Sequence, residues 1–324
     1  MSEPDHPLVT DLLGGDRLAL ARAITRIENR DAGYRDLVAA LHRRAGDAAV
    51  VGVTGSPGAG KSTLVNRLVA AYRERGEAVG VVAVDPSSPF TGGAVLGDRV
   101  RMDAARGDDG VFVRSMSTRG TLGGLSNATG DAVTALDAAG FDRVIVETVG
   151  AGQSEVDVMS VADTVAVLLT PGSGDDVQML KAGVLEIADV FVVNKADRDG
   201  VDRVVRDLRD MLSRRDRDGE WEPPIVETVA TRGEGVADLV AALADHRDHL
   251  AATGERERRA RDRYAAEIRT LLREDAGRLL EAELDRRGGV EALAERVADR
   301  ETDPYAAADE VLEPLRDCLA GRGE

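Results

Sequence analysis

A glycine-rich turn between an apolar strand and a helix constrains this chain more than any other feature. Gly55–Ser62 satisfies the pattern G-x-x-x-x-G-K-[ST], after an apolar run and before the helical segment Leu64–Glu74. In such a P-loop, glycines let successive backbone N–H groups point at a β-phosphate, and the next helix adds its positive end. Lys61 is predicted to lie between the β- and γ-phosphates, and the Ser62 hydroxyl to bind Mg²⁺. The alternative is a turn that binds nothing. The predicted nucleotide-binding residues here are Gly55, Ser56, Pro57, Gly58, Ala59, Gly60, Lys61, Ser62 and Thr63.

Lysine is scarce in this sequence. Only three of the 42 basic residues are lysine, namely Lys61, Lys181 and Lys195. A GC-rich genome or a surface adapted to high salt would remove lysine wherever it is dispensable, so each remaining lysine needs an explanation. Lys181 lies in a glycine-rich segment that leads from a strand into a helix. We predict that it stabilises charge on the transferring phosphate or pairs with a partner's acid; the alternative is an ordinary surface residue.

An apolar strand that begins at Val190 ends in the sequence N-K-x-D. Guanine offers an N1–H and a 2-amino group, which one carboxylate accepts as a pair, whereas adenine has no such pair of donors. Asp197 is therefore predicted to select guanine, and Asn194 to bond the base and the backbone. The stem of Lys195 is predicted to cover the ring. The alternative is a polar turn at the end of a strand.

The strand that follows leads into a second loop of interest. This loop contains Val229, Ala230 and Thr231. Many G proteins carry a serine where Val229 stands and offer guanine O6 a backbone N–H from the next residue. Backbone donation from Ala230 does not depend on that serine, so we predict that this loop contacts the base.

Acidic residues at strand ends are candidates for holding magnesium. Asp85 and Glu147 each end a β-rich run, where a carboxylate opposite the P-loop can hold Mg²⁺ or its water, and Asp98 lies in a Gly- and Thr-rich segment. Turn and helix-capping roles are the alternatives. Gly150 is predicted to sense the γ-phosphate through its N–H. Gln153 is the nearest candidate for orienting the attacking water, and it could equally cap the following helix.

The order of apolar runs predicts the fold class. Short β-rich runs alternate with helix-length segments, which indicates an α/β protein with a mostly parallel sheet flanked by helices, as in a P-loop NTPase or G-domain. The runs are Ala49–Thr54, Val79–Val84, Gly110–Val113, Arg143–Glu147, Thr164–Leu169, Val190–Val193 and Ile225–Val229. We expect N-terminal helices over residues 1–47, the GTPase domain over 48–253 and a C-terminal helical arm over 254–324.

The arm carries an apolar stripe at helical spacing. Its members are Tyr264, Ile268, Leu271, Leu272, Leu279, Leu280 and Leu284, and Leu312, Leu315 and Leu319 predict a last short helix. The stripe either packs on its own domain or binds a second subunit. Because the preceding domain already has a full sheet, we favour a homodimer.

Composition excludes several classes of partner. Asp and Glu outnumber Lys and Arg by 59 to 42, which gives a net charge of −17 and a pI near 4.8. Such a surface repels nucleic acid and anionic membranes. No apolar run reaches the ~20 residues of a membrane helix, and no secretory signal is visible. With Cys318 as the single cysteine, an internal disulfide is excluded and a cytoplasmic location is expected.

Taken in order, these motifs resemble one family, the MeaB/ArgK group of G-protein chaperones of methylmalonyl-CoA mutase. The resemblance runs from about residue 14 to 254. It rests on GDRLALARAIT from Gly15, GSPGAGKST from Gly55, VDPSS from Val84, TGG from Thr91 with LGDR from Leu96, GTLGG from Gly120, VETVGAGQSE from Val146 and NKAD from Asn194.

The resemblance implies a GTPase that assembles with an adenosylcobalamin-dependent mutase, gates cofactor loading and protects the mutase from inactivation. It implies Mg²⁺ held through Ser62, Asp85, Asp98 and Glu147. A mobile loop around Pro171–Lys181 would transmit the nucleotide state, and the arm would form the homodimer. Hydrolysis is expected to be slow alone and stimulated by the partner.

Two other functions share this nucleotide core. A metallochaperone GTPase for a nickel enzyme would need clustered soft or imidazole ligands. His246 and His249 lie three apart on a predicted helix, but an exposed polar face is the favoured interpretation. A kinase that uses ATP or GTP is the other alternative.

Overall fold

The computed structural model describes residues 7–85, 107–117, 124–148, 161–172, 184–214 and 221–320. The chain divides into two compact units, Met1–Ala260 and Arg261–Glu324. The N-terminal helices therefore belong to the same unit as the sheet. The three-part division into 1–47, 48–253 and 254–324 stays a prediction.

A seven-stranded sheet organises the first unit, in the order β3-β2-β4-β1-β5-β6-β7. All the pairings between its strands are parallel, which confirms the predicted fold class. The strands are β1 (Ala49–Gly55), β2 (Val79–Asp85), β3 (Val111–Ser117), β4 (Arg143–Thr148), β5 (Thr164–Leu169), β6 (Val190–Asn194) and β7 (Ile225–Thr228). Because every strand runs the same way, the P-loop after β1 and the N-K-x-D segment after β6 lie at one edge of the sheet.

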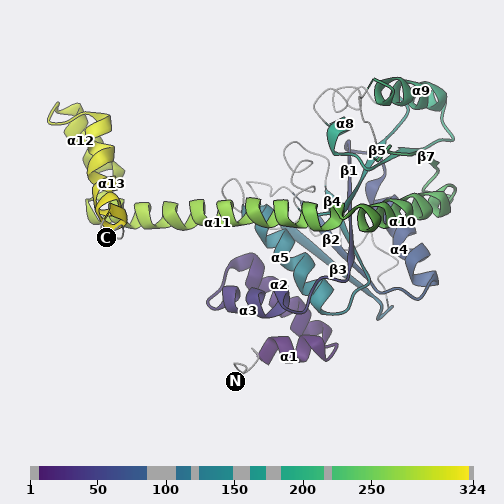
Figure 1. Ribbon diagram of the computed structural model, residues 1–324, viewed down its shortest axis with the longest axis horizontal. Coiled ribbons are helices and arrows are strands. Elements are labelled where there is room, and N and C mark those ends of the chain that lie inside the picture. The colour runs from purple at the N-terminus through teal and green to yellow at the C-terminus, as the bar shows by residue number, and fades with distance from the viewer. Residues whose placement is uncertain are drawn as a thin grey trace. The chain divides into compact units, whose positions relative to one another are not determined.

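Helices bury both faces of this sheet, so its strands are apolar on both sides. In β4, Val144 and Val146 point to one core and Ile145 to the other. The helix α5 (Gly124–Ala138) covers the first face, and α4 (Lys61–Glu74) and α10 (Val236–Thr253) cover the second (Figure 1). Two further helices of this unit are α8 (Val184–Ile187) and α9 (Val201–Leu212).

Three N-terminal helices pack behind α5: α1 (Pro7–Leu13), α2 (Arg17–Asn29) and α3 (Tyr34–His42). Asp16 caps α2, because its carboxylate accepts the N–H groups of Leu18 and Ala19 at 2.7 and 3.3 Å. Ile24 and Ile27, part of the predicted apolar spacing, are buried in the same core as the sheet face under α5. These helices therefore enlarge that core.

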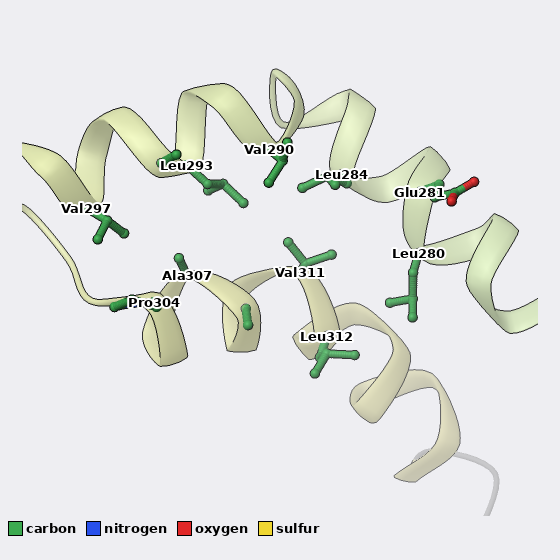
Figure 2. Close-up of a pocket in the computed structure, with 12 residues that line it drawn as sticks. Leu280, Glu281, Leu284, Val290, Leu293, Val297, Pro304, Ala307, Val311 and Leu312 are labelled. Carbon is green, nitrogen blue, oxygen red and sulfur yellow. The ribbon is translucent and has the colours of Figure 1, made fainter. Parts of the chain in front are cut away.

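The second unit contains the part of α11 (Glu255–Arg286) beyond Ala260, together with α12 (Gly289–Ala298) and α13 (Pro304–Ala320). Leu293, Ala307 and Val311 form a small core against α11. An apolar groove of about 550 Å³ lies between these helices, with Leu284 and Val290 on one side and Val311 on the other (Figure 2). The predicted short final helix is in fact 17 residues long.

Part of the α11 stripe is exposed in this unit. The exposed members are Tyr264, Ile268, Leu272 and Leu279, whose exposures run from 47% to 64%. Leu280 and Leu284 instead pack against the small core. Among the described residues of the whole chain, none of the helices has the length and apolar character needed to cross a bilayer.

Candidate functional site

The P-loop between β1 and α4 approaches its neighbours so closely that two of its positions require glycine. Gly55 has a φ of +145°, and a Cβ there would lie 2.4 Å from the carbonyl oxygen of Leu168. Gly60 has a φ of +96°, and a Cβ there would lie 2.5 Å from Nδ2 of Asn194. The turn is thus shaped by contact with β5 and with Asn194 of the N-K-x-D segment.

Lys61, the first residue of α4, is buried beneath this turn with 6% of its surface exposed. Its Nζ donates to the carbonyl oxygens of Gly55 at 2.6 Å and Ser56 at 3.0 Å. A buried ammonium needs such acceptors, because leaving it unpaired would cost several kcal/mol, ~3 or more. The two P-loop carbonyls therefore hold the Lys61 ammonium in place.

Ser62 and Glu147 meet beside the P-loop. Glu147 is in β4, directly across from Val53 of β1, and is 7% exposed. The Ser62 Oγ donates to Oε1 of Glu147 at 2.5 Å. A hydroxyl and a carboxylate are hard oxygen donors, the kind that Mg²⁺ prefers, so these two side chains fit a magnesium site.

The other candidates near this edge are only partly described. Asp85 ends β2, and its backbone pairs with Ser117; its side chain lies outside the described residues. Asp98, Gly150, Gln153 and Lys181 also lie outside them. The structure therefore brings together Ser62 and Glu147 from the predicted magnesium set.

Asn194 connects the P-loop to the loop that follows β7. Its Nδ2 donates to the carbonyl oxygen of Ala59 at 2.7 Å, and its Oδ1 accepts from the backbone N–H of Ala230 at 3.1 Å and the Thr228 hydroxyl at 3.1 Å. The residue is 2% exposed. In this conformation the Ala230 N–H, predicted to contact guanine O6, donates to Asn194.

Lys195 adopts an unusual backbone conformation, with a φ of +60°. The left-handed region costs a non-glycine residue about 1–2 kcal/mol. This conformation accompanies a contact between Lys195 Nζ and the carbonyl oxygen of Gly58 at 2.7 Å. A strained residue that joins the N-K-x-D segment to the P-loop is typical of a binding site.

Asp197 faces an arginine that no motif marks. Its Oδ2 lies 3.2 Å from Nη1 of Arg232, and Arg232 in turn pairs with Glu234 through Nε at 2.6 Å and Nη2 at 3.3 Å. A second unmarked arginine, Arg67 of α4, donates to the carbonyl oxygens of Ala230 at 3.0 Å and Thr231 at 2.6 Å. Sequence reasoning missed both, and the only available signal was the place of Arg67 on the helix that begins at the P-loop.

A buried polar cluster lies where β5 and β6 begin, at the other edge of the sheet. Asp189, just before β6, accepts both terminal nitrogens of Arg259 at 3.2 and 3.1 Å. Nδ1 of His246 lies 2.8 Å from the Thr164 hydroxyl, and Trp221 donates to the Asp189 carbonyl at 2.7 Å. Burial lowers the pKa of His246.

The interpretation of His246 as part of an exposed polar face is wrong, since its side chain is fully buried. It packs against Trp221, with ring centroids 4.9 Å apart. Within the described ranges, no three His, Cys, Asp or Glu side chains are grouped so that they could hold a metal ion.

Relatives of known name share most of this chain. A protein of Pyrococcus abyssi that is provisionally named a GTPase is 47% identical over 311 residues, which cover 95% of this chain and 96% of the relative. The GTPase ArgK of Escherichia coli is 38% identical over 249 residues, covering 74% of this chain and 75% of ArgK.

The chain also matches a protein family and a solved structure. Residues 20–284 match the family described as methylmalonyl Co-A mutase-associated GTPase MeaB. A solved structure described as an LAO/AO transport system kinase superposes with a TM-score of 0.70 and 27% identity, covering 97% of this chain and all of the other.

Proposed function

The chain belongs to the MeaB family of methylmalonyl-CoA mutase-associated GTPases, and on this premise we propose that it is a G-protein chaperone of an adenosylcobalamin-dependent mutase. It would bind and hydrolyse GTP, gate cofactor loading into the mutase and protect that enzyme. One observation carries the nucleotide part of the proposal. Asn194 bonds to both Ala59 and Ala230, which supports a single nucleotide site that would include the P-loop and the loop of Val229, Ala230 and Thr231.

The phosphates would bind where Lys61 now bonds the P-loop carbonyls. Phosphate oxygens carry full negative charge, so they compete well with the neutral carbonyl oxygens of Gly55 and Ser56 for the Lys61 ammonium. The first turn of α4 adds backbone N–H groups and the positive end of the helix. Together these groups would position the tail of GTP or GDP.

The base would bind between Lys195 and Asp197. The carboxylate of Asp197 would accept the N1–H and the 2-amino group of guanine, and the stem of Lys195 would cover the ring. Lys195 is already tied to the carbonyl of Gly58, which fixes its backbone beside the P-loop. The loop of Val229, Ala230 and Thr231 would close the other side of the base.

Ser62 and Glu147 would hold a magnesium ion, with Asp85 and Asp98 added from the sequence prediction. When bound, Mg²⁺ neutralises charge on the β- and γ-phosphates. The bond now formed between Ser62 and Glu147 keeps both oxygens at the position that the ion would share. Glu147 is buried, so its charge would act at short range and in a medium of low dielectric.

Hydrolysis would be an in-line attack of water on the γ-phosphorus. The new bond joins the water oxygen to phosphorus, one proton of that water passes to a phosphate oxygen, the bond to the β–γ bridging oxygen breaks, and GDP and phosphate leave. Lys61 would offset the charge that develops on the leaving oxygen. Gln153 and Lys181 remain the proposed residues for orienting water and stabilising the γ-phosphate. We propose slow turnover of the isolated protein and stimulation by the mutase.

A homodimer is part of this proposal. The exposed stripe of α11 and the apolar groove of the second unit both support it, because exposed apolar surface of this kind is usually covered by a partner. The second unit would then form the dimer contact, and the first unit would bind the nucleotide.

The base-reading assignment is tested by Asp197→Asn. The amide replaces one acceptor by a donor, so GTP and GDP should bind at least about tenfold more weakly, and the xanthine nucleotides should bind better than in the parent. Asp207→Asn, an equal change on exposed α9, is the control and should leave both affinities unchanged. Unaltered GDP affinity in Asp197→Asn, measured by calorimetry, would refute guanine recognition.

The chaperone part needs a separate test. Lys181→Ala should leave GDP affinity unchanged and should lower the GTPase rate stimulated by the mutase. Equal GTPase rates of the parent protein with and without saturating mutase would refute the coupling. Loss of GDP affinity in Lys181→Ala would instead assign Lys181 to nucleotide binding.

A further inference from the structure

We propose that Arg232 is a positioning residue that fixes the carboxylate of Asp197 for guanine and thereby strengthens discrimination for the 2-amino group. The inference rests on the proposed function, because it concerns the same base site. Its starting point is the contact between Nη1 of Arg232 and Oδ2 of Asp197, 3.2 Å in length.

Arg232 extends from a tight turn. The N–H of Val229 donates to the Glu234 carbonyl at 3.0 Å, and the N–H of Arg232 donates to the Val229 carbonyl at 2.9 Å. Arg67 holds the outside of this turn through two more carbonyls. The backbone of Arg232 is therefore fixed relative to the sheet, and its side chain starts from a defined point.

Glu234 fixes the guanidinium itself. It pairs with Nε and Nη2, which leaves Nη1 directed at Asp197. The hydrogen bond to Glu234 also raises the pKa of Arg232. A planar guanidinium held on two nitrogens has a set orientation, so its third nitrogen offers Asp197 a donor in one direction.

The contact leaves room for the base. A carboxylate has about four positions where its oxygens accept hydrogen bonds, and Arg232 uses one of them. Guanine needs two. Arg232 can therefore stay in place when the base binds. Asp197 is 40% exposed along its side chain, so without this contact its terminal torsion would be free to rotate. Fixing the carboxylate beforehand reduces the entropy lost on binding.

Inosine diphosphate separates positioning from general loop stability. Hypoxanthine keeps the N1–H but lacks the 2-amino group. A rotating carboxylate still reaches one donor, whereas two donors require a fixed plane. Loss of Arg232 should therefore weaken GDP binding more than IDP binding. The dissociation constant of IDP divided by that of GDP should fall toward one.

The experiment measures GDP and IDP affinity by calorimetry at low salt. Arg232→Ala should weaken GDP binding about three- to fivefold, the upper part of the range expected for an exposed ion pair, and should change IDP binding less. Arg232→Lys should restore part of the loss, because it keeps a cation. Arg203→Ala removes a similar exposed pair on α9 and should change neither affinity.

Two further measurements sharpen the test. In an Asp197→Asn background, Arg232→Ala should have no added effect if it acts through that carboxylate. At ~1 M salt, the loss of GDP affinity caused by Arg232→Ala should shrink, because the Debye length at that salt concentration is only about 3 Å. A loop that had merely lost packing would show neither behaviour.

Three results would overturn the inference. Tighter GDP binding by Arg232→Ala would make Arg232 a competitor of the base. Equal weakening of GDP and IDP without rescue by lysine would make it a structural residue of the loop. Unchanged GDP and IDP affinities in Arg232→Ala would show that Arg232 has no role in base binding. Failure of the proposed function has a different signature, namely GDP binding that survives Asp197→Asn.

Discussion

The Ser62 hydroxyl lies 2.5 Å from a carboxylate oxygen of Glu147, and this contact joins the P-loop helix α4 to the central strand β4. Both residues are held by regular structure. Ser62 is in the first turn of α4, and Glu147 has Val53 and Ala83 as its partners on the two neighbouring strands. The two oxygens are thus placed by one helix and one strand.

Glu147→Gln tests what this carboxylate contributes. The amide oxygen can still accept the Ser62 hydroxyl, so the fold should persist, but the negative charge is lost. Removing such a group beside a metal typically weakens metal binding 10–100-fold, roughly, and the advantage that Mg²⁺ gives to GDP binding should shrink accordingly. GDP dissociation constants with Mg²⁺ and with EDTA measure this. Glu227→Gln, on an exposed position of β7, is the control; an identical response of the two variants would contradict the assignment.

Gly60→Ala tests the contact between the P-loop and Asn194. The new Cβ would lie 2.5 Å from Nδ2 of Asn194 and would also occupy a left-handed position. Gly76 also has a positive φ, and a Cβ there would meet nothing within 4 Å. Gly76→Ala therefore measures the cost of the left-handed backbone alone, about 1–2 kcal/mol of unfolding free energy. Gly60→Ala should reduce the free energy of unfolding by more than that. Denaturant titration of both variants measures this free energy. Equal losses in the two variants would show that the Asn194 side chain moves aside at no cost.

His246→Gln tests the buried cluster through pH. Burial lowers the pKa of His246 in the folded protein, so the unfolded chain binds this proton first as the pH falls. Stability is therefore unaffected above the usual histidine value near 6.5, and it falls below it by at most about 1.4 kcal/mol per pH unit. The slope between pH 7.5 and 5.5 should flatten in His246→Gln. His42→Gln, at an exposed position, should keep the parent slope; a flat parent curve would refute the burial argument.

Leu272→Arg tests the homodimer. The side chain is 64% exposed in the chain by itself, so the substitution should cost the monomer little. A charge in an apolar dimer contact would lack a partner, and the dimer should dissociate. Sedimentation equilibrium of Leu272→Arg measures the mass. Thr270→Arg, two positions along on another side of α11, is the control and should stay dimeric. A parent protein that sediments as a monomer would remove the proposed dimer.

Local pattern was enough to predict much of the fold. Thr164–Leu169 was predicted as a strand with the bounds that β5 has, and the apolar run before Asn194 differs from β6 by one residue. Both are continuous apolar runs closed by polar residues, which is how a strand buried on both faces reads. The P-loop was equally clear, since its glycines and its lysine stand at fixed spacing.

Contacts made across the fold could not be read in this way. Arg232 and Arg67 reach the base loop from places that no spacing rule connects, and 39 arginines gave no reason to choose these two. His246 is different, because a signal was present. It follows Leu243 by three residues and precedes Leu250 by four, so it occupies the apolar face of α10.

The final helix was underestimated for a similar reason. Asp303 accepts the N–H groups of Tyr305 and Ala306 at 2.9 and 3.1 Å, and Pro304 begins α13. An acidic cap followed by proline is a start signal that can be read from sequence. The leucines near the end of the helix indicate only its last turns, whereas Asp303 and Pro304 indicate where it begins.

The amide of Asn194 has a consequence for how such a protein could change its ligand. Its two ends hold the P-loop and the last base loop at once, so an altered residue there would disturb tail and ring together. The Asp197 side chain does not join two loops in this way, because its described contact is with Arg232. On the proposed function, a mutation at Asp197 would exchange one purine for another while the contacts of Asn194 with the P-loop stayed intact.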